Sequence, residues 1–247
     1  MKRRPTAVPG PRSLDHTLAW AFDGAAHLRG LMTRMGDDAF AAPSLLPGWS
    51  RAHVLTHVAR NADAMINLLR WARTGVRTPA YASREQRDAD IEVGARRPPA
   101  EIRADVVESS DRLAREVRAM PESAWSARVE NAQGKELPAS DIPWLRAREM
   151  WIHAVDLDVG ASFADMPAPM LSALLTDVAA DMGEKPDCPA LRLTTPDGAV
   201  WQVGEQDGAV TITGPAHELA AWLLGRSKGR ELRSSAGRKL PELPRWL

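Results

Sequence analysis

The sequence is poor in cysteine, tyrosine and phenylalanine: among 247 residues there are one Cys, one Tyr and three Phe. Because Cys188 is the only cysteine, an internal disulfide is impossible, and a reducing cytoplasm is the expected compartment. Neither sign of charge is in excess, with 32 basic and 32 acidic residues, so the composition does not support binding to nucleic acid or to an anionic membrane. No run approaches the ~18 consecutive apolar residues of a transmembrane helix, so no membrane association is expected.

Amphipathic helical patterns occupy roughly the first 160 residues. They predict four helices, over about residues 14–35, 51–73, 100–120 and 141–160. Ser50 is a suitable N-cap for the second helix, and Gly75 is a suitable stop. The stretch 76–97 has no long apolar stripe and is predicted to be a loop with room for a short helix. Four long amphipathic helices favour a helical bundle.

The pattern changes after a fifth predicted helix, at about residues 169–182. Apolar residues then alternate at period two in three short strands, with a hairpin signal at Asp207–Gly208 before the third, and a last helix begins at Pro215. The three predicted strands are residues 191–195, 200–203 and 210–213. This pattern predicts a small α+β domain, onto which the aromatic C-terminus is expected to dock.

Three segments are therefore predicted. Residues 1–13 are basic and proline-rich, and form a disordered tail rather than a signal peptide. Residues 14–165 form a metal-binding helical bundle, and residues 166–247 form the small α+β domain with its docking C-terminal tail.

Glu149 and His153 lie four residues apart on the fourth predicted helix, so their side chains share one face, one turn apart. His57 lies within the apolar stripe of the second. Polar groups inside a bundle are destabilising unless they find partners, and a shared metal ion would be one. One carboxylate and two imidazoles leave coordination positions open, as in catalytic metal sites, and favour zinc or a similar divalent ion.

A second interpretation is that each of these residues is satisfied by hydrogen bonds of its own. A glutamate four residues before a histidine is common by chance, and a lone histidine on an apolar face is more often hydrogen-bonded than metal-bound. His53, one turn before His57, is an alternative ligand, and residue types alone do not decide between the two. Asp156 is either an acceptor for an imidazole N–H or a solvated acid at the helix end.

Several stretches resemble the mycothiol-dependent maleylpyruvate isomerases of the DinB-like superfamily. The segments that carry the resemblance are residues 46–51 (LPGWSR), 53–62 (HVLTHVARNA), 78–81 (TPAY), 148–157 (REMWIHAVDL), 225–226 (GR) and 244–247 (PRWL). The metal motifs mark only the broad thiol-dependent superfamily, whereas the loop and the closing segment are more specific to the isomerases. The resemblance covers almost the whole chain after the N-terminal tail.

The resemblance implies a DinB-like four-helix bundle with a smaller sterol-carrier-like α+β domain, in agreement with the change of pattern. It places the metal ligands of the family on His57 rather than His53, and on Glu149 and His153. A functionally important arginine of the C-terminal domain falls on Arg226, which by itself would be interpreted as a cation at a helix C-terminus.

The implied activity is the mycothiol-dependent isomerisation of maleylpyruvate to fumarylpyruvate, in gentisate-type aromatic catabolism. A carbon–carbon double bond does not rotate at useful rates. Addition of a thiolate makes it a single bond, rotation follows, and elimination restores the alkene as the trans isomer. A divalent metal, expected to be zinc, would lower the pKa of a coordinated thiol. The expected cofactors are therefore this metal and mycothiol.

Two other functions stay open: a mycothiol S-transferase acting on another electrophile, and a non-catalytic protein with a closed metal site. Arg87, Tyr81 and Asn61 are candidate contacts for substrate or thiol, although Arg87 and Tyr81 also fit a solvated loop. Cys188 lies in a predicted linker without an activating basic neighbourhood, so it is interpreted as incidental. The sequence does not determine the oligomeric state, and a monomer is one option.

Overall fold

The computed structural model describes residues 12–205, 207–237 and 239–246. By its internal contacts the chain divides into two compact units, residues 13–161 and residues 162–247 together with Arg12. The division lies a few residues before the predicted boundary at 165. Among the described helices, none combines the length and the apolar character that a membrane crossing requires.

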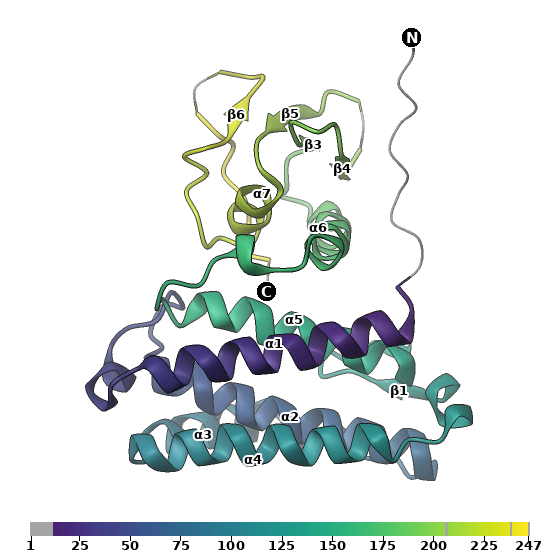
Figure 1. Ribbon diagram of the computed structural model, residues 1–247. Coiled ribbons are helices and arrows are strands. Elements are labelled where there is room, and N and C mark those ends of the chain that lie inside the picture. Colours follow the sequence, from purple (N-terminus) through teal and green to yellow (C-terminus); the bar gives the residue numbers. More distant parts are fainter. Residues whose placement is uncertain (1–11, 206, 238, 247) are drawn as a thin grey trace. The chain divides into compact units, whose positions relative to one another are not determined.

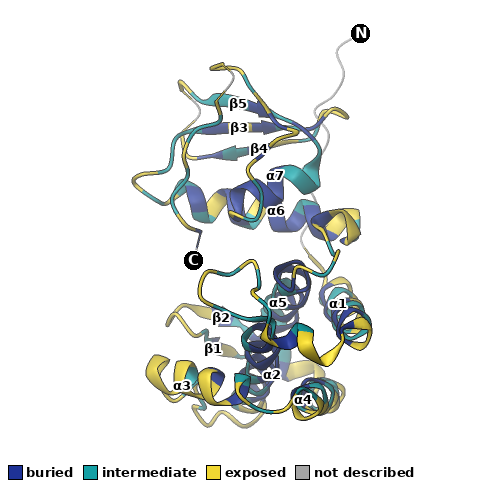
Figure 2. Ribbon diagram, turned by 90° about the vertical axis from the view of Figure 1, so that its left-hand side faces the viewer, coloured by how far each residue is buried: buried dark blue, intermediate teal, exposed yellow. Residues whose placement is uncertain are grey.

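The helical unit is built on long helices that lie alongside one another (Figure 1). Its helices are α1 (Leu14–Arg34), α2 (Arg51–Thr74), α3 (Arg84–Ala95), α4 (Pro99–Arg118) and α5 (Ile142–Asp156). Helix α1 packs on α5, and α2 packs on both α4 and α5, so α2 lies in the interior of the bundle. The faces that meet are apolar and buried, while the outer faces are exposed (Figure 2).

Helix α2 begins and ends where local chemistry predicts. The Ser50 hydroxyl accepts a hydrogen bond from the backbone N–H of His53, and the Ser50 backbone N–H donates to the His53 ring at 3.2 Å. At the other end Gly75 takes the left-handed conformation with φ 72°, which glycine adopts without steric cost. The interior position of α2 follows from its broad apolar surface, which includes Val54, Leu55 and many other buried residues.

The helical unit differs from the sequence prediction in three places. Residues 84–95 form the helix α3, capped by Ser83, where a loop with room for a short helix was expected, so the helix takes up most of the second half of that stretch. Between α4 and α5 the strands β1 (Arg128–Glu130) and β2 (Glu136–Pro138) form an antiparallel hairpin that was not predicted. Helix α5 ends at Asp156 rather than near residue 160, because Arg51 donates to the carbonyls of Leu157 and Asp158 at 2.6 and 2.8 Å. Such a contact joins distant segments, so local sequence signals do not reveal it.

The second unit contains a mixed four-stranded sheet with two helices over one of its faces (Figure 2). Its elements are α6 (Ala168–Gly183), β3 (Leu191–Thr194), β4 (Val200–Val203), β5 (Val210–Thr213), α7 (Ala216–Leu223) and β6 (Arg233–Ser234). The three longer strands and both helices follow the prediction, which confirms the α+β class.

The strand order does not follow the prediction. The order is β4-β3-β5-β6, and β5 pairs in parallel with β3 instead of forming a hairpin with β4. The hairpin interpretation of Asp207–Gly208 is therefore wrong. A turn signal reverses the chain locally, but packing decides which strand is central, and β3 buries both Leu191 and Leu193. The short edge strand β6 was not predicted.

The two ends of the chain are described in part. Most of the tail predicted over residues 1–13 lies outside the described residues, but Ser13 caps α1 and Arg12 pairs with Asp177 at 2.6 Å. Near the C-terminus Trp246 is buried, and its indole N–H donates to Asp181 of α6 at 3.1 Å. The aromatic end therefore packs against the unit to which it belongs.

Candidate metal centre

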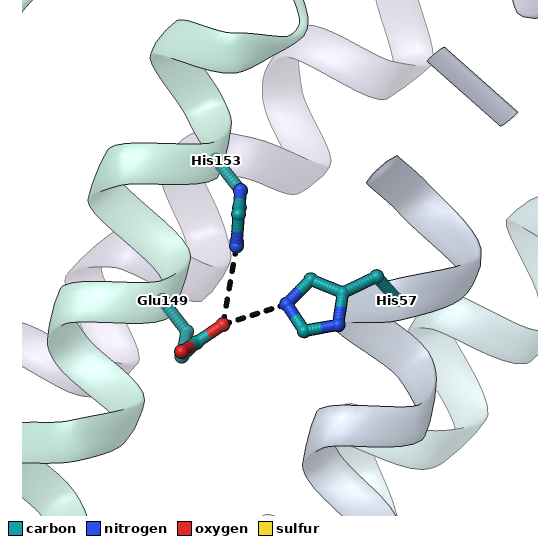
Figure 3. Close-up of side chains that lie close together, drawn as sticks. All are labelled: His57, Glu149 and His153. Atoms are coloured by element: carbon teal, nitrogen blue, oxygen red, sulfur yellow. Dashed lines mark hydrogen bonds and ion pairs between the residues drawn. The ribbon is translucent and has the colours of Figure 1, made fainter. Parts of the chain in front are cut away.

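Three side chains from two helices converge inside the helical unit (Figure 3). His57 comes from α2, and Glu149 and His153 come from successive turns of α5. Glu149 Oε2 lies 2.8 Å from His57 Nε2 and 3.2 Å from His153 Nε2, and the two imidazole rings meet edge to face with centroids 4.6 Å apart. One potential ligand atom of each residue lies within 4.8 Å of the others.

Burial and mutual contacts set the charges of these groups. Burial lowers the pKa of His57 more than its contact with Glu149 raises it, so His57 is neutral at neutral pH. Burial also acts to lower the pKa of His153, but hydrogen bonds with Asp156 and Glu149 outweigh it and raise the pKa to about 9. Burial acts to raise the pKa of Glu149, but its hydrogen bonds with His153 and His57 outweigh burial and hold this pKa well below its usual range. The cluster therefore contains a carboxylate, an imidazolium and a neutral imidazole.

This set of donors fits a divalent metal ion. Two imidazole nitrogens and one carboxylate oxygen are ligands that zinc takes in catalytic sites, with a further position open. Two ligand atoms about 2.1 Å from a tetrahedral ion stand roughly 3.4 Å apart. The Glu149 oxygen is already 2.8 and 3.2 Å from the two imidazole nitrogens, so the side chains would need to move only slightly.

Asp156 supports His153 from the side away from the cluster. It is fully buried, and its Oδ2 lies 2.9 Å from His153 Nδ1, so it holds that ring and directs Nε2 toward Glu149. The interpretation of Asp156 as a solvated acid is therefore wrong. The alternative ligand His53 lies outside the cluster, with its ring against Ser50 and its Nε2 3.4 Å from Glu92.

The three residues predicted to contact substrate or thiol lie around His57. Arg87 is in the first turns of α3, its Nη2 is 3.3 Å from His57 Nδ1, and its guanidinium carbon is 5.8 Å from the centre of the Tyr81 ring. Burial and the charge of Glu149 raise the pKa of Tyr81, while the positive charge of Arg87 opposes that rise. The structure brings these residues together, and the interpretation of Arg87 and Tyr81 as a solvated loop is wrong.

Arg146, one turn before Glu149 on α5, is a buried charge that sequence reasoning did not single out. Its Nη1 donates to the Val58 carbonyl at 2.9 Å and to Asn61 Oδ1 at 2.8 Å. Arginine is rarely buried, so the residue type argues for a surface position. The available signal was spacing, since residues 146 and 149 share a helix face.

Two other candidates belong to the second unit. Arg226 follows α7, and its Nη1 donates to the Leu224 carbonyl at 2.6 Å, as expected for a cation at a helix C-terminus. Its role toward the substrate stays a prediction. Cys188 follows α6 and is partly buried, and burial raises the pKa of its thiol, which disfavours the nucleophilic thiolate.

Comparison with known families and structures adds sequence and fold evidence. Residues 21–158 match the family model described as the mycothiol maleylpyruvate isomerase N-terminal domain, and residues 165–245 match the C-terminal domain of the same family. A crystal structure of a mycothiol-dependent maleylpyruvate isomerase is 35% identical, covers 95% of this chain and 98% of its own, and has a TM-score of 0.90. A histidine-to-alanine mutant of such an isomerase gives 34% identity with the same coverage and TM-score.

A more distant similarity concerns the fold alone. YfiT from Bacillus subtilis, which has an unusual four-helix bundle topology, is 15% identical and gives a TM-score of 0.50. The similarity covers 64% of this chain and 90% of YfiT, and at this level of identity it shows a shared fold and nothing further. A comparison with curated proteins found no match.

Proposed function

The chain belongs to the mycothiol maleylpyruvate isomerase family, and we propose that it converts maleylpyruvate to fumarylpyruvate with mycothiol as cofactor. One observation carries the proposal. His57, Glu149 and His153 converge in a chain that is 35% identical, over nearly its whole length, to a mycothiol-dependent maleylpyruvate isomerase. The reaction class is therefore cis–trans isomerisation.

The isomerisation needs a nucleophile that can be added and removed. Mycothiol supplies a sulfur whose reversible addition turns the double bond into a single bond about which the carbon chain can turn. His57, Glu149 and His153 would hold a divalent ion, for which their donor set favours zinc, and that ion would lower the pKa of a coordinated thiol. The protein has no comparable nucleophilic sulfur of its own, because Cys188 is its only cysteine and burial raises the pKa of that thiol.

Arg87 is suited to hold a carboxylate of the substrate. A guanidinium can only donate, so in the present arrangement His57 Nδ1 accepts from Arg87 and Nε2 carries the ring proton toward Glu149. If His57 uses Nε2 as a ligand, its proton must lie on Nδ1, where it faces the Arg87 donor. Arg87 then has an N–H available for another acceptor, and paired hydrogen bonds to a carboxylate satisfy it well.

We also propose that the reaction takes place in the cytoplasm, as a step of gentisate-type aromatic catabolism. The single cysteine is compatible with a reducing compartment, where a thiol cofactor stays reduced.

The proposal is tested by incubating zinc-loaded protein with maleylpyruvate, with and without mycothiol, and identifying the product by NMR. We expect fumarylpyruvate only when the thiol is present. His57→Ala should abolish the activity, whereas the matched variant His53→Ala, one turn away, should retain it. A stable thiol conjugate would instead indicate an S-transferase, and the absence of any thiol-dependent product would contradict both assignments.

A further inference from the structure

We propose that a groove between α1 and α4 binds an unbranched aliphatic carboxylate such as octanoate. The carboxylate lies against Arg146, and the chain lies along the apolar walls that the two helices provide. None of the candidate metal ligands His57, Glu149 and His153 is among the described residues that line this groove. The site therefore goes beyond the proposed isomerase function and does not depend on it.

The groove exists because α1 and α4 each pack on another helix rather than on each other. Helix α1 packs on α5 and α4 packs on α2, whereas α1 and α4 make little contact with each other. Both helices lie on the same side of the bundle (Figure 2). A cavity remains between them, and its lining includes Leu18 and Phe22 of α1, Leu113 and Val117 of α4, and Met65 of α2.

The cavity is apolar from its mouth to its floor. Phe22 is 42% exposed, whereas Met65 and Ile142 are buried, so the cavity opens to solvent beside Phe22. Apart from Ser110 and Arg146, the described side chains that line it are apolar. A concave apolar surface with very few polar groups is typical of sites for small molecules, in which the polar groups fix the orientation of the ligand.

Arg146 gives the floor of the cavity a positive charge. It is 3% exposed, and although burial lowers its pKa to about 10, it stays charged at neutral pH. Its Nη1 donates to the Val58 carbonyl at 2.9 Å and to Asn61 Oδ1 at 2.8 Å, and both acceptors are neutral. Its buried Nη2 has no hydrogen-bond partner among the described residues.

Such an arginine is poorly explained by stability alone. A buried cation without a counter-charge is unfavourable for folding, and a hydrophobic residue of similar size would often serve a contact between helices better. The free Nη2 donor and the neutral partners of Nη1 both point to an anion as the group that completes the site, since a guanidinium bonds most strongly to a carboxylate or a phosphate.

The size of the cavity favours a narrow ligand. Its volume is about 40 Å³, whereas an apolar cavity that accepts benzene measures about 150 Å³. A ring therefore does not fit beside Arg146, but an unbranched chain can lie along the groove with one side in solvent. The lining stretches 18–25 of α1 and 110–117 of α4 are each two turns long, roughly 10 Å, which suits a chain of medium length.

The experiment titrates the zinc-loaded full-length protein with octanoate by isothermal calorimetry. We expect saturable binding whose affinity rises by about twofold to fourfold per methylene from butanoate to octanoate, because each added methylene leaves water. Octanol has the chain without the charge, and should bind at least about tenfold more weakly. Acetate and chloride have the charge without the chain, and should compete with octanoate only at much higher concentrations.

Two substitutions on α4 form a matched pair. Ala114 lines the groove, so Ala114→Phe should fill it and abolish the binding of octanoate. Ala104 is exposed on the same helix and does not line the groove, so Ala104→Phe should leave the affinity within about twofold. Arg146→Met should weaken octanoate by at least about tenfold without affecting octanol. If Arg146→Met fails to fold, the Ala114 and Ala104 variants and the comparison with octanol decide.

A carboxylate could also bind at the metal centre, and His57→Ala distinguishes the two sites. This variant should bind octanoate like the wild type, because His57 does not line the groove. The proposal is overturned if octanoate shows no saturable binding, if octanol or chloride binds as tightly, if Ala114→Phe binds normally, or if only His57→Ala loses binding. None of these measurements involves turnover, so they test the groove independently of the isomerase activity.

Discussion

At the scale of single residues, Asp156 shows how a side chain outside the ligand set can govern the candidate metal centre. It is fully buried and lies 2.9 Å from His153 Nδ1, so it fixes the orientation of that ring. Asp156→Asn removes the negative charge, and we expect it to weaken zinc binding about tenfold to hundredfold, as for other carboxylates behind a ligating histidine. Competition with a chelator measures the affinity. The exposed Asp158 provides the control, since Asp158→Asn should leave the affinity within about twofold, and equal affinities in both variants would contradict the orienting role.

The pKa of His153 predicts how zinc binding depends on pH. Contacts with Asp156 and Glu149 raise this pKa to about 9, whereas the pKa of His57 is lowered. Ligation requires an unprotonated Nε2, so at neutral pH zinc displaces about one proton, and that proton comes from His153. The affinity should therefore rise by about tenfold per pH unit from pH ~7 and level off near the pKa. Calorimetry in buffers of different ionisation enthalpy counts the released proton. A zinc affinity that stays constant between pH ~7 and the pKa of His153 would refute the claim that zinc displaces a proton from His153.

Cys188 provides a test of the external thiol. Burial raises the pKa of its thiol, so little thiolate is present at neutral pH. Cys188→Ser should keep both kcat and the dependence on mycothiol, within about twofold. Steady-state kinetics at several mycothiol concentrations measure both quantities. Loss of turnover with zinc still bound would show that the protein supplies the nucleophile itself.

The spacing of residues in the sequence predicts only part of the candidate site. Helical periodicity is enough to place Glu149 and His153 on one face, and the structure brings them together with His57. It does not separate His57 from His53, because the difference lies in the capping contact between His53 and Ser50. The resemblance to a known family made that choice.

At the scale of helices, the close approach of α1 and α5 depends on Gly24. A Cβ at this position would lie 2.7 Å from Trp151 Nε1 and 2.8 Å from Met150 Cβ, and the Trp151 ring is held by its hydrogen bond to the Trp20 carbonyl. Alanine gains about 1 kcal/mol of helix propensity over glycine, but overpacking costs about 1–3 kcal/mol. The difference between these two terms predicts that Gly24→Ala lowers the free energy of unfolding by up to about 2 kcal/mol, measured by urea denaturation.

The matched control lies on the same helix. Gly30 has only the flexible end of Arg34 near its Cβ position, at 3.6 Å, so Gly30→Ala should raise the free energy of unfolding by about 0.5–1 kcal/mol. If both variants were stabilised, the close packing of α1 on α5 would be wrong.

The elements themselves were predictable where local signals define them. Ser50 and Gly75 delimit α2 through contacts within a few residues, so the sequence predicts both ends of that helix. The end of α5 and the order of the strands depend on contacts between distant segments, such as Arg51 with Leu157, and no local pattern contains them. The helix α3 lacks a long apolar stripe, since it buries little more than Ile91 and Gly94, and periodicity therefore allowed a short helix in this stretch without giving its position or length.

At the scale of the whole molecule, the metal ligands belong to the helical unit, whereas Arg226 belongs to the other unit. We predict that Arg226→Ala lowers turnover by about tenfold or more, as for the loss of a charged hydrogen bond, without changing zinc content. Kinetics together with metal analysis test this expectation. The exposed Arg230 of the same unit is the control, and Arg230→Ala should behave like the wild type. Unchanged kinetics in Arg226→Ala would contradict a role in turnover, and would leave Arg226 only as a hydrogen-bond donor at the C-terminal end of α7.

The central claim is that the protein uses an external thiol as a catalyst at the site formed by His57, Glu149 and His153. Its most direct test is the amount of product formed when mycothiol is present at about one tenth of the maleylpyruvate concentration. An isomerase regenerates the thiol in every turnover, so we expect complete conversion to fumarylpyruvate with all of the mycothiol recovered free. Conversion that stops when the mycothiol is consumed, or that proceeds equally well without it, would contradict the claim.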